Sequence, residues 1–320
     1  MYKHFLTSVL LVFFMLSCSK PSPFEGKMRE SVQTSLSWRN DTTGIWETAG
    51  WWNSANVLTA TIRYGAVTKD PAIPSVIEDV FEKARHYQVG VDSTGTPRYC
   101  DNFINDYYDD EGWWALAWIE ASKLTGEKKY LDMAEIIFDD MTTGWSDACG
   151  GGIFWKKNPL HYKNSIANNL FSLTAIRLYK ATQNPAYLDW FKKNVDWYTQ
   201  TGMINTDIYQ IEDGTKDDCT PNRNAHYTYN QGVAIAVLAE MYLQTNDKSY
   251  LELAEKIADA TITTQLVTDE GILREMKPEI DDSNDGVQFK GIFIRHLAFL
   301  YEVTKNPAYK DFILKNAESI

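Results

Sequence analysis

The sequence predicts an all-α fold in which helical hairpins close into a ring, an (α/α)6 toroid. A short polar turn recurs about every 60 residues, and helical periodicity flanks it on both sides. The Asn and Asp residues of these turns suit helix caps, and their Pro suits the first turn of the next helix. In each pair the first helix is richer in small and apolar residues, so it should be the more buried. The turns begin at Thr68, Thr125, Thr182, Thr245 and Thr304.

The expected helices form pairs that follow a lone helix at Met28–Trp38. The pairs are 54–67 with 73–87, 112–124 with 128–141, 165–181 with 186–199, 230–244 with 248–264, and 288–303 with 307–320. Open solenoids usually have shorter repeats and short loops, whereas the connections between these pairs are long, which favours a ring with its loops on one face. Six hairpins need twelve helices and eleven are counted, so we expect the last helix to be missing from this chain. The first and last helices should lie near each other across a gap.

The N-terminus has the pattern of an export signal. The apolar run Phe5–Leu16 is too short to span a bilayer as a lasting helix, and it ends just before Cys18 in a pattern that resembles a bacterial lipoprotein box. We expect lipid on Cys18 and an exported, membrane-anchored protein, in the periplasm or at the cell surface. A plain secretory signal is the alternative. The expected parts are a lipoprotein signal peptide at 1–18, a tether at 19–26 and the folded domain at 27–320.

The composition favours a neutral polymer over an anionic one as the partner. The net charge is −12, whereas nucleic-acid binders carry basic patches, so we expect no nucleic acid. The 11 Trp and 18 Tyr offer flat faces with one polar handle, which suit sugar rings as well as a protein core. No CxxC or HExxH spacing occurs, so no metal and no cofactor are expected. Besides Cys18, an odd set of cysteines leaves at least one unpaired and the pairing open: Cys100, Cys149 and Cys219.

The candidate site is organised around Asp109 and Asp110, at the start of an expected buried helix. Acids there also suit helix capping, which is the alternative explanation. However, amides, acids or Lys also stand beside aromatic residues at the start of every other buried helix. Because these residues occupy the same position in each repeat, they should converge in one cleft. Asn and Gln match vicinal hydroxyls, and glycines allow a close backbone approach. The candidate binding residues are Trp51, Asn53, Tyr108, Trp113, Gly151, Gly152, Trp155, Asn164, Tyr229, Asn230, Gln231 and Lys290.

Five stretches of the chain combine acids, glycines or amides with aromatic residues, and they lie at 108–114, 149–155, 162–164, 229–232 and 289–291. Together they resemble glycoside hydrolase family 76, the endo-α-1,6-mannanases. The resemblance implies that the domain is a catalytic (α/α)6 barrel that cleaves α-1,6-mannan with retention of configuration. It also implies that Asp109 is the nucleophile and Asp110 the acid/base, with no metal needed. Glu111 is interpreted as an acid that caps the first helical turn.

Three other functions stay open at this stage. A transglycosylase on the same linkage would use the same two acids, and a polysaccharide-binding lipoprotein would keep the fold without turnover. A toroid enzyme on an acidic polymer would want a basic cleft, but the loops offer few basic residues, among them Lys163, Arg223 and Lys290. The acidic segment 281–285 lacks the pattern of a calcium loop, so we interpret it as a solvated turn.

Overall fold

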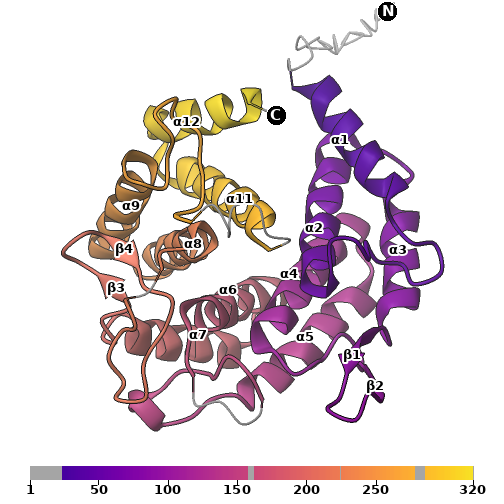
Figure 1. The fold of residues 1–320 in the computed structure, drawn as a ribbon, viewed down its shortest axis with the longest axis horizontal. Coiled ribbons are helices and arrows are strands. Elements are labelled where there is room, and N and C mark those ends of the chain that lie inside the picture. The colour runs from indigo at the N-terminus through magenta and orange to yellow at the C-terminus, as the bar shows by residue number, and fades with distance from the viewer. Residues whose placement is uncertain (1–23, 158–161, 224, 278–284, 320) are drawn as a thin grey trace, which may run out of the picture.

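The structure, a computed structural model, describes residues 24–157, 162–223, 225–277 and 285–319 (Figure 1). These ranges contain eleven α-helices, none of which is long and apolar enough to cross a membrane. The segments expected as signal peptide and lipid site lie outside them. The helices are α1 (Glu25–Ser37), α2 (Trp51–Thr68), α3 (Ile73–Ala84), α4 (Tyr108–Thr125), α5 (Lys128–Thr142), α6 (Ser165–Thr182), α7 (Pro185–Tyr198), α8 (Thr228–Thr245), α9 (Lys248–Thr263), α11 (Gly286–Thr304) and α12 (Pro307–Glu318).

The helices form the two layers of a ring. Helices α2, α4, α6, α8 and α11 pack against one another in chain order on the inside, and α3, α5, α7, α9 and α12 lie outside them (Figure 1). The inner helices α4, α6 and α8 are buried on nearly every side, whereas the outer helices α5 and α9 each bury one stripe. The predicted all-α toroid, with the first helix of each pair more buried, is therefore confirmed.

The threonine that begins each repeated turn ends the inner helix with two hydrogen bonds. In all five turns its hydroxyl donates to the carbonyl four residues earlier and accepts from the N–H two residues later. The next residue is left-handed in every case, which stops the helix. Asn184, Asp247 and Asn306 then cap the outer helices that follow. The sequence repeat is thus one turn geometry used five times.

The ring is drawn together between its first and last inner helices by polar contacts. Trp52 donates to Asp285 (3.1 Å), and Arg295 donates to the Asn56 side chain (2.8 Å). The ribbon is open between α1 and α12 (Figure 1), as the count of eleven helices leads one to expect.

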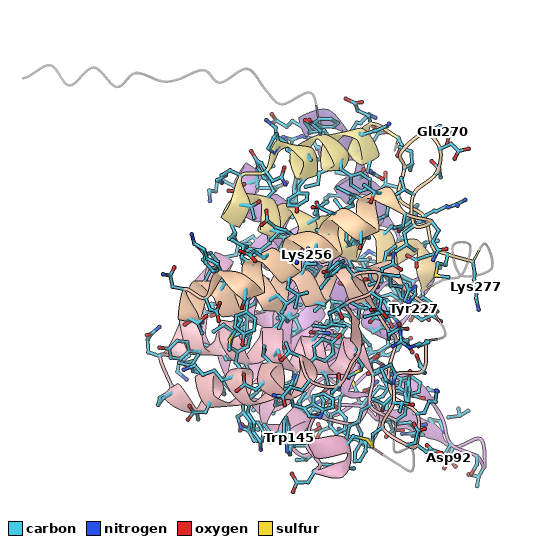
Figure 2. The ribbon with its side chains drawn as sticks, turned by 90° about the vertical axis from the view of Figure 1, so that its left-hand side faces the viewer. Asp92, Trp145, Tyr227, Lys256, Glu270 and Lys277 are labelled. Carbon is cyan, nitrogen blue, oxygen red and sulfur yellow. A yellow bond between two sulfur atoms is a disulfide. The ribbon has the colours of Figure 1, made fainter. Side chains whose placement is uncertain are left out.

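Two details differ from the sequence-based expectation. Helix α4 begins at Tyr108 and not at Gly112, because acids are stable in a first helical turn although they break the apolar period. Two loops expected without strands contain small antiparallel hairpins: β1 (Gln88–Val91) with β2 (Pro97–Tyr99), and β3 (Ile204–Asn205) with β4 (Gln210–Ile211). Figure 2 shows Asp92, Tyr227 and Lys277, from three different long loops, along one side of the molecule. Three of the expected long loops therefore reach the same side of the molecule.

A close contact between two inner helices gives a stability prediction. A Cβ on Gly232 in α8 would lie 2.6 Å from the Cα of Phe293 in α11, whereas a Cβ on Gly291 would meet no atom within 4 Å. We expect Gly232→Ala to destabilise the fold by about 1–3 kcal/mol, since backbone must move. The matched variant Gly291→Ala should stabilise it by about 0.5–1 kcal/mol, because glycine is a poor residue inside a helix. Thermal unfolding of the two variants checks this, and equal melting temperatures would contradict it.

Candidate active site

The first turn of α4 forms part of the wall of a cavity of about 590 Å³. Its lining combines carboxylates with aromatic rings, a mixture suited to a ligand that has apolar faces and hydroxyl edges. Neither Lys nor Arg occurs among the described residues that line it. The lining residues are Trp52, Tyr107, Asp109, Asp110, Trp113, Trp155, Tyr162, Asn164, Asp213, Tyr227, Tyr229, Asp285 and Phe289.

The two carboxylate oxygens of Asp109 have different surroundings. Oδ2 accepts a hydrogen bond from Trp155 Nε1 (2.9 Å), whereas Oδ1 is buried and has no hydrogen-bond partner among the described residues. Burial raises the pKa of Asp109 to about 7, and the charge of Asp213 adds to the rise. The Trp155 donor and the backbone N–H groups at the start of α4 oppose it by stabilising the anion. Asp109 therefore keeps an unpartnered oxygen on a carboxylate that can ionise near neutral pH.

Asp110 is in a setting that favours the protonated form. Burial raises its pKa well above the ordinary value, and the neighbouring charges of Asp109 and Asp285 raise it further. A hydrogen bond from Asn105 Nδ2 to Oδ2 (2.7 Å) opposes the rise. Two carboxyl groups this close do not both ionise readily, so the pair favours a state in which Asp110 holds one proton.

A third carboxylate, Asp213, reaches the cavity from the loop between β4 and α8. Tyr162 Oη and Asn230 Nδ2 both donate to it, the latter at 3.1 Å, and these bonds oppose the rise in its pKa that burial causes. Sequence reasoning missed Asp213 because its loop has no periodic pattern. A second acidic pair before a glycine, Glu212-Asp213-Gly214, was the one available signal.

Four of the predicted binding residues line the cavity beside the two aspartates. Trp113 and Trp155 supply ring faces, and Tyr229 stacks on Phe289 with ring centroids 3.9 Å apart. Asn164 also accepts from the N–H of Ala167 (3.2 Å), so its amide caps α6 as well as facing the cavity.

The other predicted residues lie outside the lining of this cavity, and most of them are neighbours of lining residues on a helix. Successive residues on a helix project about 100° apart, so a neighbour of a lining residue faces another direction. Tyr108 packs against Gly144, and Gln231 bonds the backbone of Ile211 at the base of a hairpin. Trp51 stacks on Tyr87, Asn53 is buried, and Asn230 donates a hydrogen bond to Asp213. Gly151 and Gly152 pack on Trp197. Lys290 is also absent from the lining.

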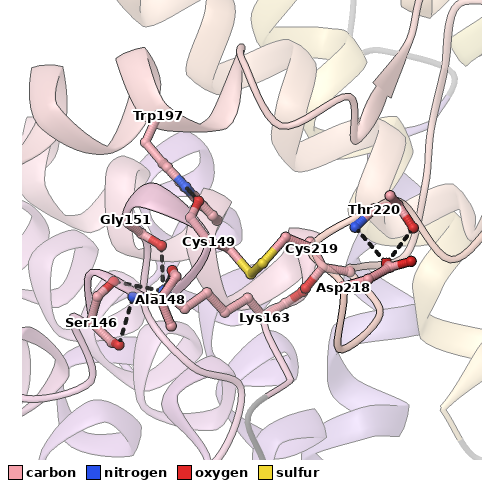
Figure 3. The surroundings of a disulfide bond; sticks show 10 residues. Ser146, Ala148, Cys149, Gly151, Lys163, Trp197, Asp218, Cys219 and Thr220 are labelled. Carbon is pink, nitrogen blue, oxygen red and sulfur yellow. Dashed lines mark hydrogen bonds between the residues drawn. A yellow bond between two sulfur atoms is a disulfide. The ribbon is translucent and has the colours of Figure 1, made fainter.

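Lys163 is part of the scaffold of the glycine loop and not a free cation in the cleft. Its Nζ is buried and donates to the carbonyl oxygens of Ser146 (2.7 Å), Ala148 (2.6 Å) and Gly151 (Figure 3). Burial lowers the pKa of Lys163 to about 8, against the attraction of Asp147. Lys163, one of the few basic residues in the long loops, therefore has its donors occupied by three backbone carbonyls.

A disulfide anchors the same loop from the other side. Cys149 is joined to Cys219, and its carbonyl accepts from Trp197 Nε1 at 2.9 Å (Figure 3). The third cysteine, Cys100, is a buried free thiol. The bond ties the loop that precedes Trp155 to the loop that follows Asp213, so it connects two segments that supply groups to the cavity.

Glu111 is buried in an ion pair and does not cap α4. Its Oε1 lies 2.6 Å from Lys157 Nζ, which also contacts Asp140 at 2.6 Å. The interpretation of Glu111 as a capping acid is wrong: its carboxylate accepts no hydrogen bond from the first-turn N–H groups and lies against Lys157. Burial raises the pKa of Glu111 well above its ordinary value, and the charge of Lys157 opposes this rise.

Asp285 from the predicted acidic turn lines the cavity, whereas 281–284 lie outside the described residues. In the described part of the chain, no group of three or more His, Cys, Asp or Glu side chains is arranged to hold a metal ion.

The donor to Asp109 gives a prediction about pH dependence. Trp155→Phe removes a hydrogen bond that lowers the pKa of Asp109, so this pKa should rise. For a reaction that uses Asp109 as an anion, the acid limb of the kcat/KM profile should then move to higher pH. At about one unit below neutrality, kcat/KM should fall roughly tenfold, the usual effect of a hydrogen bond to a charged group. Trp190→Phe, on the outer helix α7, is the control. An unmoved acid limb in Trp155→Phe would refute the role of this donor.

Comparison with known proteins gives the family. Residues 25–319 match the family model described as glycosyl hydrolase family 76. A putative mannan endo-1,6-alpha-mannosidase of Schizosaccharomyces pombe is 29% identical over 267 residues, which cover 78% of this chain and 58% of the relative. The chain spans about half the length of the curated relatives it matches.

Two solved structures have the same fold. The Lin0763 protein of Listeria innocua is 28% identical, with a TM-score of 0.77 over 92% of this chain and 84% of that one. The GH76A alpha-1,6-mannanase of Salegentibacter sp. HEL1_6 is 25% identical, with a TM-score of 0.78 over 92% and 87%. With the family model matching almost the whole described chain, this protein belongs to glycosyl hydrolase family 76.

Proposed function

We propose that this protein is a retaining glycoside hydrolase that cleaves α-1,6-mannosidic bonds in mannan, with Asp109 as nucleophile and Asp110 as acid/base. The observation that carries the proposal is one cavity lined by two adjacent aspartates in unequal surroundings. Asp109 keeps an unpartnered oxygen, and burial raises the pKa of Asp110 well above its ordinary value. Retaining hydrolysis needs this division of roles between two carboxyl groups.

In the first step Asp109 Oδ1 forms a bond to the anomeric carbon of the sugar. The bond between that carbon and the glycosidic oxygen breaks, and the oxygen takes the proton of Asp110 as it leaves. Trp155 holds the other oxygen of Asp109 and so orients the carboxylate for attack. Formation of the ester neutralises Asp109, so the pKa of Asp110 falls and its carboxylate can act as a base.

In the second step Asp110 takes a proton from a water molecule as that water attacks the anomeric carbon. The ester bond to Asp109 breaks, and both aspartates return to their starting protonation states. Two displacements on opposite faces of the sugar give net retention of configuration.

The substrate class rests on the cavity walls and on the relatives. Rings of Trp113, Trp155 and Tyr229 offer faces for sugar C–H groups, and the described lining offers no cation for an acidic polymer. The Schizosaccharomyces pombe relative is named as a mannan endo-1,6-alpha-mannosidase and the Salegentibacter enzyme as an alpha-1,6-mannanase, which supports α-1,6-mannan as the polymer.

Replacing each aspartate separates the two roles. Asp109→Asn should abolish turnover of linear α-1,6-mannan, because no nucleophile remains. Asp110→Asn should lower kcat/KM by roughly 10²–10⁴-fold on the polymer, the usual size of general-acid help, and by much less on a substrate with an activated leaving group. The exposed Asp132→Asn on α5 is the control.

Product analysis completes the test. The first-formed anomer, followed by NMR, should have the substrate's configuration. An inverted product, or near-normal turnover by Asp109→Asn, would overturn the mechanism. Transfer of mannosyl units to added oligosaccharide in place of release to water would identify a transglycosylase, and binding without turnover by the parent protein would identify a binding protein.

We also propose that Cys18 carries a lipid that anchors the protein to a membrane after export. The apolar run before Cys18 is one support, and the Cys149–Cys219 disulfide is another, since such bonds persist in oxidising compartments. Cys18→Ala should move the protein from the membrane fraction to the soluble fraction, whereas the control Ser22→Ala should not. Unchanged fractionation of Cys18→Ala would contradict lipidation.

A further inference from the structure

A second cavity, of about 230 Å³, shares Asp110 with the first. Residues of the hairpin β1–β2 line it on one side, and the segment before α4 lines it on the other. The tip of the hairpin, at Asp92, lies on the loop face in Figure 2. This cavity is therefore placed with the active site and not on a remote surface.

The two aspartates are distributed unequally between the cavities. Asp110 lines both, whereas Asp109 lines only the first. In the proposed reaction the nucleophile contacts the anomeric carbon of the sugar that becomes attached, while the acid contacts the oxygen of the sugar that leaves. A substrate that satisfies both contacts has its scissile oxygen at Asp110 and its attached part in the first cavity. The leaving part then enters the second cavity, which Asp110 borders and Asp109 does not.

The second cavity offers groups that suit a sugar. Arg98, which is 43% exposed, forms an ion pair with Asp106, and its guanidinium has further donors that this pair does not use. The Trp51 indole lines the cavity, and its Nε1 is buried without a hydrogen-bond partner among the described residues. Val89 adds an apolar contact. The cavity has less than half the volume of the first, so we expect it to take a short part of the substrate.

We propose that this second cavity binds the mannosyl unit on the leaving-group side of the scissile bond, with Arg98 donating to its hydroxyl groups. The inference rests on the proposed hydrolase function and deepens it. It assigns a direction to the bound polymer: the part that becomes attached to the enzyme lies among the aromatic rings, and the departing part lies under the hairpin. It also gives the hairpin a role in choosing substrates and acceptors.

Two substrates separate binding in the second cavity from the chemistry in the first. Linear α-1,6-mannan has a sugar as its leaving group, whereas α-1,6-mannobiosyl fluoride releases fluoride, which leaves the second cavity empty. Bond breaking balances in the same way for both: the bond from the anomeric carbon to Asp109 forms as the bond to oxygen or fluorine breaks. Only the departing oxygen needs the proton of Asp110.

Arg98→Ala should lower kcat/KM on mannan roughly tenfold, the effect of losing hydrogen bonds from a charged group, and should change kcat/KM on the fluoride by less than about twofold. Val89→Trp, which puts a much larger side chain on another residue that lines the cavity, should produce the same selective loss. Arg29→Ala is the matched control, because Arg29 is a similarly exposed arginine in an ion pair on the distant helix α1.

The outcomes distinguish the proposals. Equal losses on both substrates, or no loss on mannan in either variant, would overturn the assignment of this cavity while leaving the hydrolase function intact. A parent protein that is inactive on both substrates would overturn the hydrolase function and this inference with it.

Discussion

The chemistry of this protein depends on burying two adjacent carboxyl groups at the start of one helix. Desolvation disfavours the charged form, and the two charges repel, so such a pair persists only where the surroundings compensate it. Here Trp155 supports Asp109, Asn105 supports Asp110, and the free N–H groups of α4 support the carboxylate of Asp109. Because these hydrogen bonds and N–H groups stabilise the two carboxylates unequally, the pKa values of Asp109 and Asp110 are raised to different extents. One cavity can therefore present an anion beside an acid.

That compensation requires the loops to be held in place. Trp155 follows a glycine loop that Lys163 anchors through three backbone carbonyls, and Asp213 belongs to the loop that the disulfide ties to it. Neither anchor lines the first cavity. Their effect on the reaction is indirect, because they position Trp155 and Asp213. A hydrogen bond tolerates a change of only a few tenths of an ångström in its length, so these positions matter.

The ring supplies the rigid frame for these loops. Inner helices approach closely where small residues allow it, as at Gly232 against Phe293, and the five threonine turns return the chain from each inner helix to its outer partner. Since every turn lies at the end opposite to the long loops, the loops converge on one face. The convergence of loop residues at the site is a consequence of a single repeated turn.

The sequence by itself determined the fold class, the helix pairs and the place of Asp109 and Asp110 at a helix start. These features depend on local patterns, namely the period of apolar residues, the turn residues and the preference of acids for a first helical turn. The resemblance of its motifs indicated the family before any coordinates. Trp155 and Tyr229 were also found this way, because aromatic residues recur at the same phase of each repeat.

Only the tertiary structure decided which of the neighbouring residues face the cavity. Gln231 and Tyr108 lie beside site residues in the chain but turn into the protein, since a helix rotates each successive side chain by about 100°. Glu111 and Lys163 found partners far along the chain, Asp213 arrived from a loop without periodicity, and Cys149 paired with Cys219 across 70 residues. Contacts of this kind depend on how distant segments meet, and local sequence patterns carry no information about that meeting.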